Sequence, residues 1–396
     1  MLAIGLTGLL ASTPAATAPS TEIRFEADGH AVIPFDLRNQ HLWIRGQLNG
    51  ADSIWIVVDT GASTSVIDEG VARRQSIPLT GGHEAHGAGG TQQGHDAQGV
   101  TVELPGLKLH KQRMDALDLS SLTQSGARPM QLILGYELFE SSVVRFDYPR
   151  GLIEVWDADH APKSMPGATV PMSLIQNHPY VEATLHVPGR RALKGRFVID
   201  SGSSGAVLIA PEITADESLL TAFPRTLVNI GRGVGGEVKS HLARADSFTI
   251  GGLNFARPVV SMPDPSQGRI SVVGSIGNIG GQILGRCSVT FDYARKRIHI
   301  DPGPAFLRPF EADMLGASLN RTAEGIMVRW VNRDSPAAEA GLEVGDRILQ
   351  VDDQPADRID PSALRLQMQQ EGRTVRLRLQ RGTGSVEKTL TLRRLL

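Results

Sequence analysis

Hydrophobic and polar residues alternate over short runs along most of this chain, which is the period of β-strands with one buried face. Two such runs, residues 42–48 and 53–58, flank Asn49-Gly50, a dipeptide typical of a tight hairpin turn. Residues 180–187, followed by Pro188-Gly189, repeat this arrangement. Gly, Pro and Asn/Asp turns separate the runs, so we expect a mainly β protein with only short helical turns as far as residue 304.

The pattern changes after residue 304. Residues 325–331 alternate as a strand, and residues 335–342 read as a short helix with Ser335 as its N-cap and Pro336 in its first turn. A second helix is expected from Asp360-Pro361 to about Gln370, before a closing strand. We therefore expect a separate small domain, a β-sandwich with two helices, over residues 311–396.

Four landmarks occur twice in the first three quarters of the chain. Their offsets are 141, 145, 145 and 146 positions, and such near-constant spacing indicates two copies of one domain. We place one lobe at 22–160 and the other at 168–304. The landmark pairs are Asp59-Thr60-Gly61 with Asp200-Ser201-Gly202, Leu134-Gly135 with Ile279-Gly280, Phe146-Asp147-Tyr148 with Phe291-Asp292-Tyr293, and Gly87–Gly90 with Gly233–Gly236.

Asp59 and Asp200 each end an apolar, β-branched run. A carboxylate in that position is costly to bury unless it is hydrogen-bonded or paired. If the two turns meet, the carboxylates cannot both ionise cheaply, so the pair supplies one acid and one base. Ser203 follows the second turn where Ala62 follows the first. A hydrogen bond from the Ser203 hydroxyl would favour Asp200 as the ionised partner and Asp59 as the protonated one.

With these motifs, residues 30–396 resemble the bacterial retropepsin-like aspartic proteases that hold both lobes in one polypeptide and carry a PDZ domain. The resemblance implies two duplicated acid-protease β-barrel lobes with a catalytic cleft between them. It implies that Leu134-Gly135 and Ile279-Gly280 pass behind the Asp turns and that hydroxyls cross-link these turns. The catalytic residues would be Asp59 and Asp200, supported by Thr60, Gly61, Ser201, Gly202 and Ser203.

The resemblance also implies two flaps and a peptide groove. Neither Gly-rich segment contains Tyr, so we expect substrate closure through backbone contacts from both loops. In the PDZ domain, an extended peptide would add to a strand facing a helix, and backbone N–H groups would hold its terminal carboxylate; alternatively, the domain packs on the protease and gates it. The residues are Gly87, Ala88, Gly89, Gly90, Gly233, Val234, Gly235 and Gly236 for the flaps, and Gly325, Ile326, Met327, Val328, Leu364 and Met368 for the groove.

Three other motifs resemble sites of a different chemistry, and for each a simpler interpretation is favoured. Residues 231–236 fit Gly-x-Gly-x-x-Gly, but strand-like segments follow them, so a hairpin is favoured over a dinucleotide site. His83-Glu84-Ala85-His86, with His95-Asp96 nearby, lacks the spacing of a zinc protease helix, and a solvated flap base is favoured. Residues 202–205 have the wrong spacing for a nucleophile elbow. We expect no metal and no cofactor.

Composition narrows the function classes. The 396 residues carry a net charge of only −2, which gives no indication of nucleic-acid binding. The single Cys287 precludes an intrachain disulfide and reads as a core residue. Residues 2–11 form an apolar run too short to span a bilayer but suited to a signal peptide within residues 1–20. We expect export to the periplasm or cell envelope, with no stable membrane span in the mature chain.

The function expected is an aspartic endopeptidase acting on polypeptide substrates, with a C-terminal peptide as a further ligand at the PDZ groove. Two alternatives stay open. One is a catalytically silent peptide-binding or adaptor protein that uses the cleft and the PDZ groove. The other is a non-peptidase hydrolase with a substrate such as a glycan, although an aromatic content of 5% disfavours a sugar platform.

Overall fold

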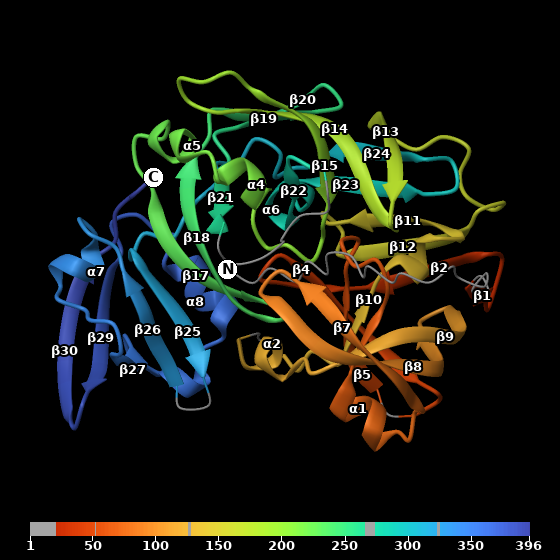
Figure 1. Ribbon diagram of the computed structural model, residues 1–396, viewed down its shortest axis with the longest axis horizontal. Coiled ribbons are helices and arrows are strands. Elements are labelled where there is room, and N and C mark those ends of the chain that lie inside the picture. Colours follow the sequence, from red (N-terminus) through yellow and green to blue (C-terminus); the bar gives the residue numbers. More distant parts are fainter. Residues whose placement is uncertain (1–20, 52, 126–127, 266–273, 323–324) are drawn as a thin grey trace.

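Two β-rich lobes and a smaller domain make up the computed structural model (Figure 1). It describes residues 21–396, except residues 52, 126–127, 266–273 and 323–324. The first lobe is red to orange, the second yellow-green to teal, and the C-terminal domain blue. The mainly β architecture predicted from the alternating pattern is confirmed. No helix in the described ranges has the length and apolar character needed to cross a bilayer.

The N-terminal lobe is built on a mixed, mainly antiparallel sheet with three short helices in the described residues. Asn49 and Gly50 both have positive φ, as the predicted tight turn requires. The elements are β1 (Glu22–Phe25), β3 (Asp36–Arg38), β4 (His41–Leu48), β5 (Ser53–Val58), β6 (Val66–Asp68), β7 (Leu79–Gly87), β8 (Gly90–Leu104), β9 (Leu107–Leu117), β10 (Leu132–Leu134), α1 (Glu69–Arg74), α2 (Ser120–Ser125) and α3 (Tyr136–Phe139).

The second lobe repeats this plan. Its elements are β14 (His178–His186), β15 (Leu193–Ile199), β16 (Val207–Ile209), β17 (Leu227–Gly233), β18 (Gly236–Arg244), β19 (Ser247–Ile250), β20 (Leu253–Ala256), β21 (Val259–Pro263), β22 (Gly277–Ile279), α4 (Pro211–Thr214), α5 (Glu217–Thr221) and α6 (Gly281–Leu284). In each lobe a three-residue strand, β10 or β22, lies between two others. β10 runs parallel to β5 and antiparallel to β6, and β22 runs parallel to β15 and antiparallel to β16. The topology around the two Asp turns is therefore the same.

A sheet shared by both lobes joins them, in the order β13-β24-β23-β11-β12-β2. Its central strands, β11 and β23, pair antiparallel, so the two Phe-Asp-Tyr repeats meet across the interface. Their aromatic rings pack into one buried cluster with Phe139, which lies 5.6 Å from Phe291 between ring centroids. The strands are β2 (His30–Pro34), β11 (Ser142–Asp147), β12 (Leu152–Asp157), β13 (Ala168–Ile175), β23 (Cys287–Asp292) and β24 (Arg297–Pro302).

The C-terminal domain has a hydrophobic core of its own. The Ser335 hydroxyl caps its first helix by accepting a hydrogen bond from Ala338 N, and Asp360 caps the second, which ends earlier than predicted, at Gln367. The sheet order is β25-β26-β27-β29-β30, with β28 beside β27. The elements are β25 (Ala317–Thr322), β26 (Gly325–Val331), β27 (Arg347–Val351), β28 (Gln354–Pro355), β29 (Thr374–Arg381), β30 (Gly384–Thr391), α7 (Pro336–Glu339), η2 (Ala356–Arg358) and α8 (Pro361–Gln367).

Candidate active site

The two Asp turns meet at the interface between the lobes, and four hydrogen bonds cross-link them. Thr60 Oγ1 donates to Ile199 O at 2.8 Å and accepts from Ser201 N at 3.0 Å. Ser201 Oγ donates to Val58 O at 2.9 Å and accepts from Thr60 N at 3.0 Å. Each hydroxyl is fully buried and uses both its donor and its acceptor capacity, so the two turns are held in one rigid unit.

Backbone hydrogen bonds to β10 and β22 fix the positions of the two Asp turns. Asp59 N donates to Leu134 O and Asp200 N donates to Ile279 O, each at 2.9 Å. A methyl group on Gly135 would lie 2.7 Å from Ala62 O, and the backbone there leaves no room for a side chain. The hydrophobic-Gly segments thus support the Asp turns as the resemblance implied.

The glycines after the two aspartates allow the carboxylates to approach each other. A Cβ atom on Gly61 would lie 2.6 Å from Asp200 Oδ1, and one on Gly202 would lie 2.2 Å from Asp59 Oδ2. Both distances are far below van der Waals contact, so only glycine fits at these positions. Gly61 N and Gly202 N also donate to Asp59 Oδ1, at 2.8 and 3.0 Å.

Burial dominates the electrostatics of the pair, because Asp59 and Asp200 are 0% and 1% exposed. Burial and, secondly, the neighbouring Asp200 carboxylate raise the pKa of Asp59 well above its ordinary value. Burial also raises the pKa of Asp200, but a hydrogen bond from Asn278 opposes this rise. Asp59 is therefore the partner that keeps its proton, and Asp200 the one that ionises.

Asn278 is the residue that the sequence reasoning missed. Its Nδ2 donates to Asp200 Oδ2 at 2.8 Å, whereas no hydrogen bond joins the Ser203 hydroxyl to Asp200 among the described residues. The expected donation from Ser203 is thus wrong, although the assignment of the ionised partner stays the same. Asn278 lies on β22 where β10 has Ile133, so a polar residue inside an otherwise apolar repeat was the signal.

His41 also touches the site without having been predicted. It lies at the start of β4, and its Nε2 donates to Gly202 O at 2.9 Å. Burial lowers the pKa of His41 to about 4, so the imidazole is neutral and acts as a fixed hydrogen-bond donor at neutral pH. It therefore fixes the backbone of the second Asp turn from the first lobe.

The two Gly-rich segments form the tips of hairpins β7–β8 and β17–β18, and these tips touch. Gly89 N donates to Val234 O at 2.7 Å. Val234 is buried in a cluster of the N-terminal lobe that includes Ala62 and Ala85, whereas Ala88 packs on Leu208 and Val238 of the second lobe. Each tip is thus buried against the opposite lobe. The two tips are joined by a backbone hydrogen bond.

Comparison with known proteins gives matches for both lobes and for the C-terminal domain. A family model described as aspartyl protease matches residues 44–138 and 183–278, one segment in each lobe. A model described as PDZ domain matches residues 327–381. Both lobes thus match an aspartyl protease family model, and the C-terminal domain matches a PDZ model. The crystal structure of the aspartic proteinase from Irpex lacteus is similar at 16% identity and a TM-score of 0.45, over 70% of this chain and 98% of that one. The comparison with curated proteins found no match for this chain.

The predicted peptide strand of the PDZ domain needs a correction. Gly325, Met327 and Val328 lie on β26, which pairs with β25 on one side and β27 on the other and has no free edge. The strand at the edge of this sheet is β25, and residues of β25 and α8 line one cavity together with Ile326. Leu364 and Met368 lie in that lining, but the edge strand is β25 and not the predicted β26.

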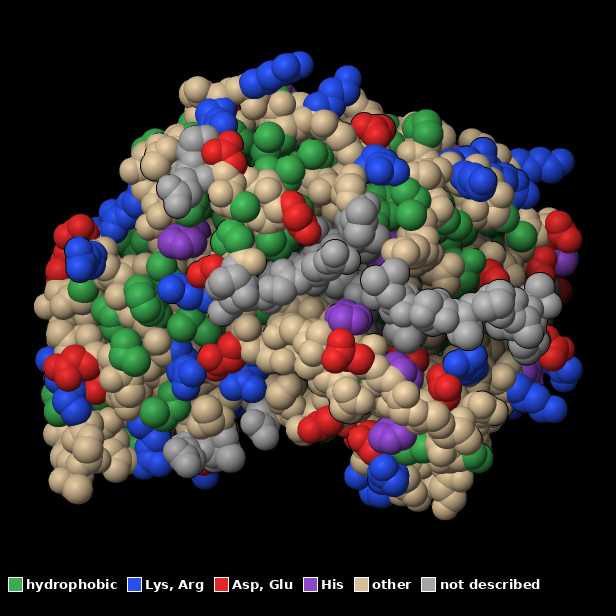
Figure 2. All heavy atoms as spheres, in the orientation of Figure 1, with side chains coloured by type: hydrophobic (Ala, Val, Ile, Leu, Met, Phe, Trp, Pro, Cys, Tyr) green, Lys and Arg blue, Asp and Glu red, His purple; other side chains and the backbone are tan. Residues whose placement is uncertain are grey.

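Among the described residues, one group has ligand atoms close enough for a metal ion: His83, Asp96 and Asp115, on the β7–β8 hairpin and the neighbouring strand β9. Figure 2 shows His side chains beside Asp and Glu over the β7–β8 hairpin. Arg113 already binds Asp96 at 2.8 Å, so a cation would compete with a guanidinium. Burial raises the pKa of Asp115 to about 6. Histidines 86 and 95 lie beside Glu84 and Glu69 instead.

Cys287 is buried at the start of β23, where burial raises its thiol pKa to about 12. A thiol in that state is not a nucleophile at neutral pH. The prediction that Cys287 is a core residue is therefore consistent with its surroundings.

Proposed function

We propose that this protein is an aspartic endopeptidase in which Asp59 and Asp200 activate a water molecule against a peptide bond. The observation that carries the proposal is the cross-linked pair of Asp turns, buried and unequal in their tendency to ionise. A pair of carboxylates with separated pKa values supplies a general base and a general acid in one site.

The proposed reaction follows from the hydrogen bonds. Apart from the interaction between the two carboxyl groups, Asp59 Oδ2 and Asp200 Oδ1 accept no hydrogen bond within the described part of the chain, and we propose that these oxygens hold the attacking water. Asp200 takes a proton from the water as its oxygen attacks the scissile carbonyl carbon, and Asp59 donates its proton to the carbonyl oxygen. The tetrahedral intermediate then collapses, and a proton from the dyad leaves with the amine. No covalent intermediate forms.

The contact between the two hairpin tips has a consequence for the class of substrate. The two hairpin tips touch, and both aspartates are buried. We propose that the tips close over the aspartates and that a polypeptide reaches them when the Gly89–Val234 contact breaks. An extended chain would then lie between the flaps and the dyad and replace the lost backbone hydrogen bonds with its own. We propose, on the same grounds, that extended polypeptides rather than small molecules are the substrates.

The test is cleavage of a diverse peptide mixture across about pH 3 to 8 by the wild type, Asp59→Asn and Asp200→Asn. Loss of cleavage in either variant, with an intact fold, supports the shared dyad. Cleavage undiminished in both would refute the mechanism. Absence of cleavage by any form would favour the peptide-binding alternative. We also propose that the protein is exported; the apolar segment that supports this lies outside the described residues, so the assay should use a chain that begins near Thr21.

A further inference from the structure

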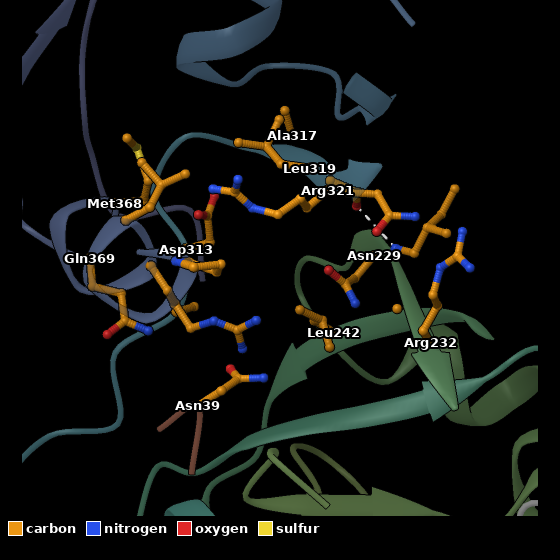
Figure 3. Close-up of a pocket in the computed structure, with 18 of the residues that line it drawn as sticks. Asn39, Asn229, Arg232, Leu242, Asp313, Ala317, Leu319, Arg321, Met368 and Gln369 are labelled. Atoms are coloured by element: carbon orange, nitrogen blue, oxygen red, sulfur yellow. Dashed lines mark hydrogen bonds between the residues drawn. The ribbon is translucent and has the colours of Figure 1, made fainter. Parts of the chain in front are cut away.

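The second flap is supported from outside by the PDZ domain. Its first strand, β17, is the outermost strand of its sheet, and in Figure 1 it lies beside β25 at the edge of the PDZ sheet. A cavity of about 180 Å³ lies between them, and Figure 3 shows Asn229 and Arg232 of β17 facing Leu319 and Arg321 of β25. Because β17 has no neighbouring strand on this side, its outward backbone groups need other partners.

The side chain of Asn332, which follows β26, pairs with the edge of β17 as a strand would. Val228 N donates to Asn332 Oδ1 at 2.8 Å, and Asn332 Nδ2 donates to Val228 O at 3.0 Å. One carboxamide thus binds both the N–H and the C=O of a single residue, which is the exchange that a hydrogen-bonded pair makes in an antiparallel ladder. Asn332 is 8% exposed, so losing it would leave a buried backbone N–H without its acceptor.

Ser318 extends this support to the next outward N–H group of β17. Ile230 N donates to Ser318 Oγ at 3.0 Å, and Ser318 is buried. Ser318 lies where the register of the β25–β26 pair shifts, so that Arg329 has no partner on β25. Such a bulge bends a strand and re-aims its side chains. The irregularity in the PDZ sheet therefore lies at the point where the sheet meets the flap.

The second strand of the flap hairpin, β18, is tied to the same part of the PDZ domain. Glu237 accepts a hydrogen bond from Arg329 at 3.0 Å, and the Lys239 ammonium lies 5.2 Å from the centre of the Trp330 ring. The Glu237 and Arg329 side chains are 34% and 42% exposed, and an ion pair that water reaches contributes little. The buried Asn332 and Ser318 bonds are therefore the main support of the flap.

The two flaps differ in this support. β7 is the outermost strand of the N-terminal sheet, as β17 is of the other sheet, but in the described part of the chain no hydrogen bond or ion pair joins β7 to the PDZ domain. The duplicated lobes therefore carry equivalent hairpins that are held unequally. The second is braced along its edge, and the first is joined to it through the contact between the tips.

We propose that Asn332 and Ser318 are positioning residues of the protease proposed above. They hold β17, so that the second flap keeps its shape and the first flap moves to admit a polypeptide. Substrate binding then has to order one flap instead of two, which lowers its cost in conformational entropy. Both residues act through the flap and not on the reacting atoms. Their effect on cleavage rests on the proposed function, whereas their hold on the flap does not.

The hold on the flap is tested by amide hydrogen exchange in the full chain without substrate. Asn332→Leu keeps the number of side-chain heavy atoms and removes both bonds to β17, and Ser318→Ala removes the hydroxyl. Each should speed exchange within residues 227–233 about tenfold or more and leave β7 unchanged. Asn320→Leu is the matched control, because Asn320 lies on β25, is also 8% exposed, and makes no side-chain hydrogen bond to any described residue.

Two variants are needed because Asn332 Nδ2 also donates to Gly316 O within the PDZ domain, at 3.2 Å. The printed bonds of the Ser318 hydroxyl all go to β17, so Ser318→Ala leaves the PDZ domain intact. Thermal unfolding verifies that each variant is folded. Unchanged exchange of residues 227–233 in Ser318→Ala, or equal acceleration in Asn320→Leu, would overturn the hold. In the wild type, outward amides of β7 should exchange faster than those of β17, and the reverse order would refute the unequal flaps.

The consequence for cleavage is a split between KM and kcat for an extended peptide substrate. Asn332→Leu should raise KM about tenfold and change kcat less than about twofold, because substrate must then order a loosened flap; Asn320→Leu should change neither. A lower KM would overturn the inference, since the contact would then hinder substrate entry. A fall in kcat at constant KM would also overturn it. Exchange is measured without substrate, so failure of the hold and failure of the proposed protease function are distinguishable.

Discussion

Asn278 provides the sharpest test of how the two aspartates divide their roles. Replacing it by Leu removes the 2.8 Å hydrogen bond to Asp200 and keeps the branching and the number of side-chain heavy atoms. Its Oδ1 has no hydrogen-bond partner among the described residues, so no other side-chain hydrogen bond to them is lost. A hydrogen bond to a charged group contributes about 1.5 to 3 kcal/mol, and about 1.4 kcal/mol corresponds to one pH unit.

The sign follows from the charge state. Asn278 stabilises ionised Asp200, so its loss makes the carboxylate harder to ionise. We expect the acid limb of the kcat/KM profile of Asn278→Leu to move to higher pH by about one to two pH units. The assay is cleavage of an internally quenched peptide across the pH range, and thermal unfolding verifies that the variant is folded.

Ser203→Ala separates the two candidate donors. Because the Ser203 hydroxyl makes no hydrogen bond to Asp200 among the described residues, the acid limb of this variant should coincide with that of the wild type. An unmoved limb in folded Asn278→Leu would refute the assignment of Asp200 as the ionised partner. A limb that moves in Ser203→Ala instead would restore the serine as the donor.

Three further outcomes are expected. Thr60→Val deprives two buried backbone groups of their partner and should cost about 2 to 4 kcal/mol in urea unfolding; a loss below about 1 kcal/mol would contradict the cross-link. Gly89→Ala places a methyl 2.3 Å from Gly236 N and should lower kcat/KM about tenfold or more, whereas Gly82→Ala, with nothing within 4 Å, should match the wild type. Burial raises the pKa of Asp115 to about 6, so the folded protein favours the protonated carboxyl and loses stability as the pH rises toward 6 and the group ionises. Asn cannot ionise, so Asp115→Asn should raise Tm at pH 7 but not at pH 4. An equal change in Tm at both pH values would refute the burial argument.

Much of the dyad could be predicted from sequence because its parts are local and repeated. An Asp-Thr/Ser-Gly turn after an apolar strand appears as one continuous segment, and the second copy shows that it is not a chance match. The hydroxyl cross-link follows from the same residues. Asn278 and His41 could not be predicted as site residues because each contacts an Asp turn from another element of the fold. A single sequence shows only that a polar residue interrupts a strand.

The PDZ groove shows a different limit. Residues 325–331 carry the most regular alternation in that domain, which identified them as a strand but not as the edge strand. Residues 317–322 are more polar, because Ser318 and Arg321 serve the flap and the cavity rather than a core. Which strand has a free edge depends on pairing partners far apart in the sequence, and periodicity carries no information about them.

The duplication has a consequence for what substitutions can achieve. In a protease assembled from two identical subunits, residue 133 and residue 278 would be the same amino acid, and a donor to one aspartate would be a donor to both. Here each half is encoded separately, so Asn278 donates a side-chain hydrogen bond to Asp200, whereas the apolar Ile133 cannot donate one to Asp59. The resting protein therefore already determines which carboxylate is the acid and which is the base before substrate binds. A single substitution can change the pKa of one carboxylate without changing the residue beside the other.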